Sequence, residues 1–185
     1  MKYVVLLIIA AVLIAGCLDT SGTKPAWAHD VSWQGDIPKS TAVVEKELWT
    51  QISPYNMEYD AVNITARNGS NGLSLRVAGV SNSAGYPDIY DFTYSKGTLT
   101  RTGYMLEAIL PQDREAAIAI AMQDREVASA GVAGIPAVRR ILPETSKKYY
   151  TPVTLLSVTW QGVSVLVDPQ ELKIVKVWKG GGTEK

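Results

Sequence analysis

The chain opens with a short apolar segment that decides where the rest of it can fold. Lys2 gives a positive start, residues 3–15 are apolar, and a cysteine follows at position 17. A charged start before a short apolar stretch is typical of a secretory signal. The stretch is shorter than the roughly 20 residues that a membrane-spanning helix needs. We therefore expect residues 1–16 to be a signal peptide, and the mature chain to fold outside the cytoplasm.

The end of this segment also indicates how the protein is held at the membrane. The string Leu13-Ile14-Ala15-Gly16-Cys17 resembles the lipobox of prokaryotic lipoproteins. The resemblance implies that a lipid joins the sulfur of Cys17, that cleavage frees its amine, and that the protein is anchored to the membrane. A plain signal with an incidental cysteine is the alternative. Because the chain has one cysteine, no thiol then remains for a disulfide, redox chemistry or a metal.

Charge and composition exclude one class of partner and permit a folded domain. The chain has 18 basic and 18 acidic residues, and removal of residues 1–16 takes one lysine away. A net charge so close to zero gives no basic field for nucleic acid, so we expect no such partner. With 46% hydrophobic residues the chain can build a core.

Local composition divides the mature chain into parts. Residues 17–38 contain turn formers without periodicity and predict a lipidated cysteine followed by a tether. Trp27 and Trp33 in this segment would either pack back on the domain or rest at the lipid headgroups. The remaining parts are an N-terminal α+β half, a C-terminal half and a disordered tail, over residues 39–110, 111–179 and 180–185.

In both halves a helix precedes a run of strands. Ser40 can cap a first helix that Pro54 ends, and Pro111 opens a second helical region that Gly131 and Gly134 end. Apolar alternation between turn signals predicts strands at 57–67, 73–77, 89–95, 98–106, 138–142, 151–160, 163–168 and 173–178. The sequence thus predicts an α+β fold with helices packed on antiparallel β-sheet. The repeated order leaves two similar helix-plus-meander halves open as an interpretation.

The second half has a recognisable order of elements. An alanine-rich helix, Ala116–Met122, precedes the hairpin Trp160-Gln161-Gly162-Val163 and the strand Val165-Leu166-Val167-Asp168. In this order residues 115–178 resemble a PepSY domain, although the turn after Asp168 lacks the glycine that the family often has. The resemblance implies an extracytoplasmic module that binds or inhibits peptidases, and it supplies no catalytic residues.

Residues that could carry catalysis are sparse. His29 is the only histidine and lies in the predicted tether, so neither a usual zinc site nor a serine triad can be assembled. Asp88 and Asp91 could offer two carboxylates to a hydrolase, but at this spacing in a strand they would point to opposite faces. We therefore expect no catalytic residue, no metal and no cofactor.

Two groups of residues are candidates for binding or modification. Tyr90, Phe92 and Tyr94 share one strand face, and such a face either binds peptides or glycans or packs in a core. Asn63 and Asn68 each begin an N-glycosylation acceptor pattern.

Together these features predict a cell-envelope lipoprotein that acts as a non-catalytic binding module. Its partner would be a peptide, a peptidase or an envelope protein. The alternative, from another class, is a structural or assembly lipoprotein that keeps a partner complex at the membrane.

Overall fold

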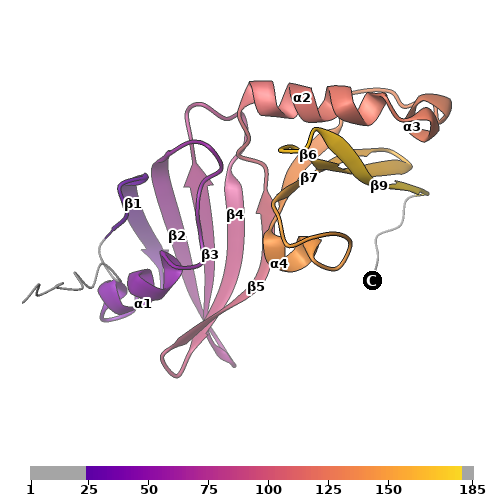
Figure 1. Ribbon diagram of the computed structural model, residues 1–185. Helices are drawn as coiled ribbons and strands as arrows, with labels where there is room; N and C mark the ends of the chain where they lie inside the picture. The colour runs from indigo at the N-terminus through magenta and orange to yellow at the C-terminus, as the bar shows by residue number, and fades with distance from the viewer. Residues whose placement is uncertain (1–23, 181–185) are drawn as a thin grey trace, which may run out of the picture.

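The computed structural model describes residues 24–180, and they form one sheet of nine strands (Figure 1). The strands follow one another across the sheet in chain order, from β1 at one edge to β9 at the other. Their bounds are β1 Ala28–Gly35, β2 Tyr59–Gly69, β3 Gly72–Val80, β4 Asp88–Ser95, β5 Thr98–Leu106, β6 Ala137–Ile141, β7 Leu155–Trp160, β8 Val163–Asp168 and β9 Lys173–Lys179.

The first strand differs from the others in its direction. β1 runs parallel to β2, with Ala28 opposite Tyr59 and Gly35 opposite Ala66. A parallel pair needs a crossover connection, and helix α1, Thr41–Leu48, lies in that connection. The remaining neighbours pair antiparallel, so the sheet is mixed.

The predicted fold class is wrong. We expected helices packed on antiparallel β-sheet, with two similar helix-plus-meander halves as an open interpretation. The molecule is mostly a single nine-stranded mixed sheet with few, short helices. Besides α1 these are α2 Pro111–Met122, α3 Arg125–Ser129 and α4 Pro143–Ser146. Periodicity indicates the strands after β1 and the tight turns between them. It does not report that β5 pairs with β6 or β1 with β2, because those partners are far apart in the chain.

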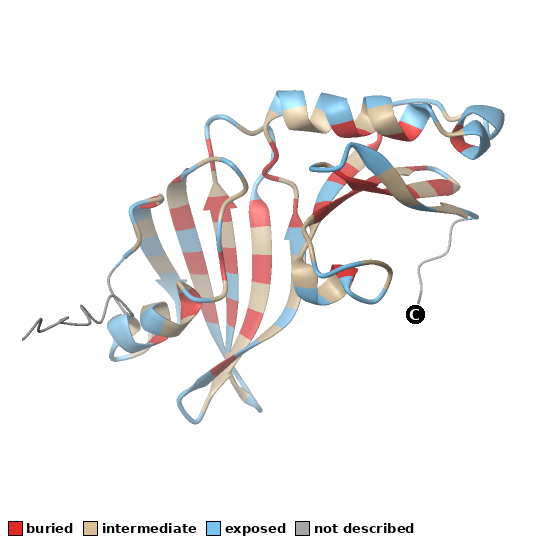
Figure 2. Cartoon of the chain, in the orientation of Figure 1, coloured by how far each residue is buried: buried red, intermediate tan, exposed pale blue. Residues whose placement is uncertain are grey.

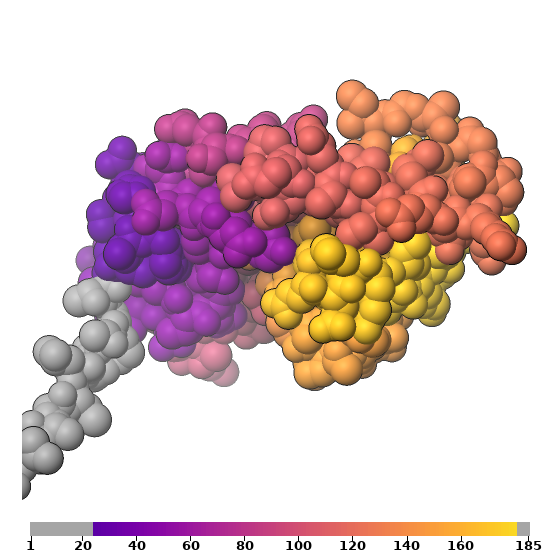
Figure 3. Space-filling view, turned by 45° about the horizontal axis from the view of Figure 1, so that its top comes forward, coloured from indigo at the N-terminus to yellow at the C-terminus, as the bar shows by residue number. Residues whose placement is uncertain are grey.

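The core forms two clusters of buried residues. Buried and exposed residues alternate along the strands of the first half (Figure 2), as in a sheet with one solvated face. The first cluster joins β1–β5 to α1 through Val44 and Leu48. The second joins β6–β8 to α2 and α3 through Ala117, Ala121 and Val127. Figure 3 shows α2 lying along the C-terminal part of the chain, where it contacts β9.

The two clusters meet at a narrow joint in the sheet. β5 and β6 share a single backbone pair, Leu106 with Arg140, whereas β2 and β3 pair over their whole length from Ala61 to Val80. Backbone hydrogen bonds between strands therefore contribute little to the stability of this joint. Side chains have to hold the two parts of the sheet together.

The segment predicted as a tether is in part a strand. Residues 28–35 form β1, and Trp27 and Trp33 pack against the first cluster, which is one of the two alternatives the sequence left open. α1 begins directly after Ser40 as predicted, although the Ser40 side chain makes no capping hydrogen bond. Cys17 and residues 181–185 lie outside the described residues.

A glycine in β3 makes room for a fully buried tyrosine. The Tyr59 side chain is inaccessible to solvent. A Cβ atom at Gly79 would lie 2.6–2.8 Å from three atoms of the Tyr59 ring, well inside the 3.5–4.0 Å at which carbon atoms pack. The missing side chain at position 79 therefore lets Tyr59 occupy this part of the core.

This contact yields a stability prediction. Gly79→Ala should lower the free energy of unfolding by about 1–3 kcal/mol, because the Tyr59 ring must move to admit the methyl group. Gly103→Ala on β5 is the matched control, since a Cβ there meets no atom within 4 Å, and it should change stability by about 0.5 kcal/mol or less. Urea unfolding followed by tryptophan fluorescence measures both. Equal stability of the two variants would contradict the packing described.

Candidate functional site

A cleft lies where the end of α1, strand β5 and the start of α4 come together. Its volume is about 430 Å³, within the usual range of small-ligand sites. The lining residues come from four separate parts of the chain. They are Trp27, Trp49, Thr50, Gln51, Ile52, Ser53, Arg101, Leu142, Pro143 and Glu144.

One side of the cleft is aromatic. The rings of Trp27 and Trp49 meet edge to face with centroids 5.9 Å apart, and Trp27 meets Tyr59 in the same way at 5.7 Å. Tryptophan Nε1 is a donor only, and a buried one normally has an acceptor. The Nε1 of Trp49 is buried and has no hydrogen-bond partner in the described part of the chain. The indole wall therefore contains an unsatisfied donor, which is itself closed to solvent.

The opposite side carries charge. Arg101 donates from Nη1 to the Gln51 carbonyl at 2.9 Å, and its Nη2 forms an ion pair with Glu144. The guanidinium also lies over the Tyr104 ring at 5.8 Å. Both charged side chains keep contact with solvent, since 21% of the Arg101 and 46% of the Glu144 side-chain surface is exposed. An exposed ion pair of this kind is worth roughly 1 kcal/mol or less, so a ligand can replace one member.

A β-bulge aims Arg101 at the cleft. Asp91 of β4 pairs with Gly103, but the next residue, Phe92, pairs with Arg101, so one residue of β5 is unpaired. An extra residue reverses which side chains face inward beyond it. Arg101 consequently lies on the same face as the buried Phe92, although it carries a charge.

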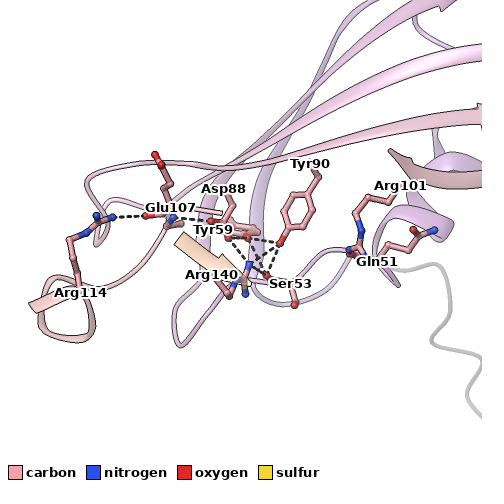
Figure 4. Close-up of polar contacts among 10 residues, drawn as sticks. Gln51, Ser53, Tyr59, Asp88, Tyr90, Arg101, Glu107, Arg114 and Arg140 are labelled. Carbon is pink, nitrogen blue, oxygen red and sulfur yellow. Dashed lines mark hydrogen bonds and ion pairs between the residues drawn. The ribbon is translucent and has the colours of Figure 1, made fainter. Parts of the chain in front are cut away.

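The backbone of Ser53 connects the cleft to a buried polar network (Figure 4). The Ser53 carbonyl accepts hydrogen bonds from Tyr90 Oη at 3.0 Å and from Arg140 Nη2 at 2.8 Å. The same Arg140 nitrogen donates to Asp88 at 2.7 Å and to Tyr90 Oη at 2.9 Å. Tyr59 Oη donates to Asp88 at 2.7 Å. One carbonyl is thus shared between the lining of the cleft and the centre of the molecule.

The network contains a buried ion pair. Only 4% of the Arg140 side chain and none of the Asp88 side chain is exposed. Burial raises the pKa of Asp88 above its ordinary value, while Arg140, Tyr59 and the Ala108 N–H favour the ionised form. Burial likewise raises the pKa of the Tyr59 and Tyr90 hydroxyls, which keeps both protonated and able to donate.

The structure separates the two aspartates that could have acted together. Asp88 is buried with Arg140, whereas Asp91 lies on the opposite face of β4 and pairs with the exposed Arg76 at 2.8 Å. The expectation that they point to opposite faces is confirmed. They cannot serve as a joint carboxylate pair.

The aromatic strand face predicted for binding is mostly core. Tyr90 and Phe92 are 0% and 1% exposed and stack with centroids 6.3 Å apart, while Tyr94 is half-buried beside them. Tyr90 and Phe92 are therefore packing residues, whereas Tyr94 lines a cleft beside Ile37 and Leu73. Alternation in β4 gave the correct shared face, but it could not show that other elements cover it.

The other predicted site residues are dispersed. Asn63 and Asn68 are exposed on β2, where Asn63 accepts a hydrogen bond from Ser32. His29 is half-exposed on β1 and bonded to Glu58 at 2.7 Å. Cys17 lies outside the described residues. Neither the two asparagines nor the histidine lines the cleft.

Not every cleft has the combination found here. One on the bare face of β2–β4 is lined by polar residues, and its charges Arg76 and Asp91 already pair with each other. Within residues 24–180, no group of three or more histidine, cysteine or acidic residues could hold a metal ion. In the same range no helix has the length and apolar character needed to cross a bilayer.

Comparisons of the chain with protein-family models, with curated proteins and with solved structures found no match. The lipobox and PepSY resemblances therefore stay predictions.

Sequence reasoning missed the cleft because no local pattern encodes it. Arg101 and Glu144 belong to different halves, and neither stands in a motif. The one available signal was the pair of tryptophans in a segment otherwise typical of a linker. That pair indicated packing of Trp27, but it did not point to Trp49.

The buried ion pair yields a second stability prediction. Arg140→Met should lower the free energy of unfolding by about 3–5 kcal/mol, because Asp88 is left buried without its counter-charge. Arg139→Met is the neighbouring control. Arg139 is half-exposed and pairs with Glu107, so its loss should cost about 1 kcal/mol or less.

Chemical denaturation of the full-length variants measures this difference. Adding Asp88→Asn to Arg140→Met removes the stranded charge and should recover part of the loss. If Arg140→Met were no more destabilising than Arg139→Met, the ion pair would not hold the joint.

Proposed function

We propose that the protein is a lipid-anchored, extracytoplasmic binding module that uses the cleft to hold a peptide end. The anchor rests on the lipobox resemblance at Cys17. Mass spectrometry of the membrane-extracted protein tests it: loss of residues 1–16 with a lipid on Cys17 is expected, and a bare sulfur on an uncleaved chain would contradict it.

The unsatisfied indole donor is the observation that carries the cleft assignment. Leaving a buried N–H without an acceptor costs roughly 1–3 kcal/mol, and a carbonyl oxygen that reaches it once the indole turns would remove that cost. The Trp49 side chain belongs to the same lining as Arg101. A ligand that carries one hydrogen-bond acceptor next to a carboxylate would match both the Trp49 donor and the Arg101 guanidinium.

The apolar lining narrows the ligand class further. Trp27, Ile52 and Leu142 offer a surface for an apolar side chain, and Arg101 offers a fork that matches a carboxylate. A peptide that ends in an apolar residue supplies a side chain, a carbonyl and a carboxylate within a few ångströms. We therefore assign such C-terminal peptide ends as the ligand.

The cleft has the chemistry of binding and lacks that of turnover. Thr50 and Ser53 carry its hydroxyl groups, and among the described residues the sole histidine bonds to Glu58 outside the cleft lining. A hydroxyl nucleophile needs an adjacent base. The groups present can hold a ligand, and no nucleophile–base pair is assembled.

Peptide titrations test the assignment. A short peptide ending in leucine with a free carboxylate should change the tryptophan fluorescence of the full-length protein, and the same peptide with an amidated C-terminus should bind at least about tenfold more weakly. Arg101→Gln should weaken binding of the free acid by a similar factor. Glu144→Gln should tighten it several-fold, because the competing carboxylate is gone.

Two conservative variants act as controls. Trp49→Phe keeps the ring but removes the donor, and should weaken both peptides by about three- to tenfold. Trp178→Phe, at a ring that packs on Tyr149 away from the cleft, should bind like the parent protein. Equal binding of acid and amide, or no effect of Glu144→Gln, would refute the peptide-end assignment. Isolation of one stoichiometric membrane complex without peptide affinity would favour the assembly role.

A further inference from the structure

The two edge strands of the sheet are built differently. β9 carries Lys173, Lys176 and Lys179, all exposed, and the ladder that joins it to β8 is interrupted by a bulge. Edge lysines and bulges are the usual means by which proteins prevent unwanted strand pairing. β1, at the other edge, is eight residues long and contains neither lysine nor proline. Within β1 itself these two devices are therefore absent, and Lys24, which precedes the strand, donates to the His29 carbonyl near its start.

The hydrogen bonding between β1 and β2 shows which backbone N–H and C=O groups of β1 point away from β2. The Asp36 N–H donates to the Ala66 carbonyl of β2 at 2.9 Å. In a parallel ladder alternate residues bond to the neighbour, so the even-numbered residues toward the end of β1 face β2. The N–H and C=O groups of Val31 and Trp33 consequently point to the free edge.

The side chains of β1 divide by face. Val31 and Trp33 are half-buried against the first cluster. Asp30, Ser32 and Gln34 are exposed on the opposite face. Both the backbone edge and the flanks of two apolar side chains are thus available to a strand laid alongside β1.

We infer that a second copy of this chain pairs there, β1 against β1 and antiparallel, about a two-fold axis at Ser32. In this register Val31 lies opposite Trp33 of the second copy, and Ser32 lies opposite Ser32. Residues 31 and 33 then form hydrogen-bonded pairs, because their backbone groups face outward. Ser32 forms the non-hydrogen-bonded pair between them, with Cα atoms about 4.5 Å apart.

The segment is self-complementary in this one register. On the core face an apolar residue meets an apolar residue, Val31 with Trp33, in both symmetric pairs. On the exposed face the Asp30 carboxylate meets the Gln34 amide, which can donate to it. A two-fold interface requires such matching, because each residue and its partner exchange places. An unrelated strand would satisfy the backbone alone.

Anchoring favours this pairing. A single strand pair is small beside the roughly 1,600 Å² buried by stable protein complexes, so association in dilute solution should be weak. Two chains tethered to one membrane have a raised effective concentration. The pairing uses β1 and does not involve the cleft, so it stands or falls independently of peptide binding.

Thiol crosslinking of the full-length protein in membrane vesicles tests the register. Ser32→Cys should form a disulfide-linked dimer on mild oxidation, because the predicted separation suits a disulfide. Asp30→Cys and Gln34→Cys should each crosslink poorly alone and well when the two variants are mixed. Ser74→Cys, exposed on β3 on the same face as Ser32, is the matched control and should stay monomeric, as should the parent chain.

A charge at the axis gives an independent readout. Ser32→Lys places two like charges opposite each other and should abolish the dimer, as measured with a crosslinker that does not react with amines. Peptide binding at the cleft should be unchanged in this variant. No excess of Ser32→Cys dimer over the Ser74→Cys control would overturn the inference. Crosslinking of Ser32→Cys to a different protein, or of Asp30→Cys to itself as strongly as to Gln34→Cys, would overturn it as well.

Discussion

The buried ion pair between Asp88 and Arg140 is the interaction on which the rest of this molecule depends. The sheet is joined between β5 and β6 by one backbone pair, and Arg140 is a member of that pair. Its guanidinium crosses from the second half to Asp88 in β4 and to the Ser53 carbonyl after α1. A charge this deep is tolerated only when it is paired and hydrogen-bonded, so the partners of Arg140 also fix how the two clusters sit against each other.

The cleft depends on the same arrangement. Glu144 and Leu142 follow β6, whereas Trp49 and Arg101 belong to the first half, so the cleft exists only while the halves keep their relative position. Ser53 lines the cleft with one part of its backbone and serves the ion pair with its carbonyl. Because the walls are held by buried groups, a ligand meets a preformed site and loses little free energy in ordering it.

Much of the local secondary structure could be predicted from the sequence, whereas little of the pairing between distant segments could be. The alternation of Leu73, Leu75 and Val77 and the proline at position 111 placed β3 and α2 correctly, because both signals act over a few residues. The tether was extended too far, since β1 is stabilised by β2 across a crossover that leaves no periodic trace. The burial of Asp88 could not be predicted, because its partner Arg140 lies 52 residues away. Long-range pairing decides such cases, and one sequence does not display it.

Native-state hydrogen exchange tests the central claim most directly, by comparing the opening free energies of amides in the middle of β3 and β8. If the ion pair joins the halves into one cooperative unit, the amides of Val77 and Val165 should exchange with the same free energy, equal to that of global unfolding. A markedly lower value for one of them would contradict the account, because that half could then open while the other stayed folded.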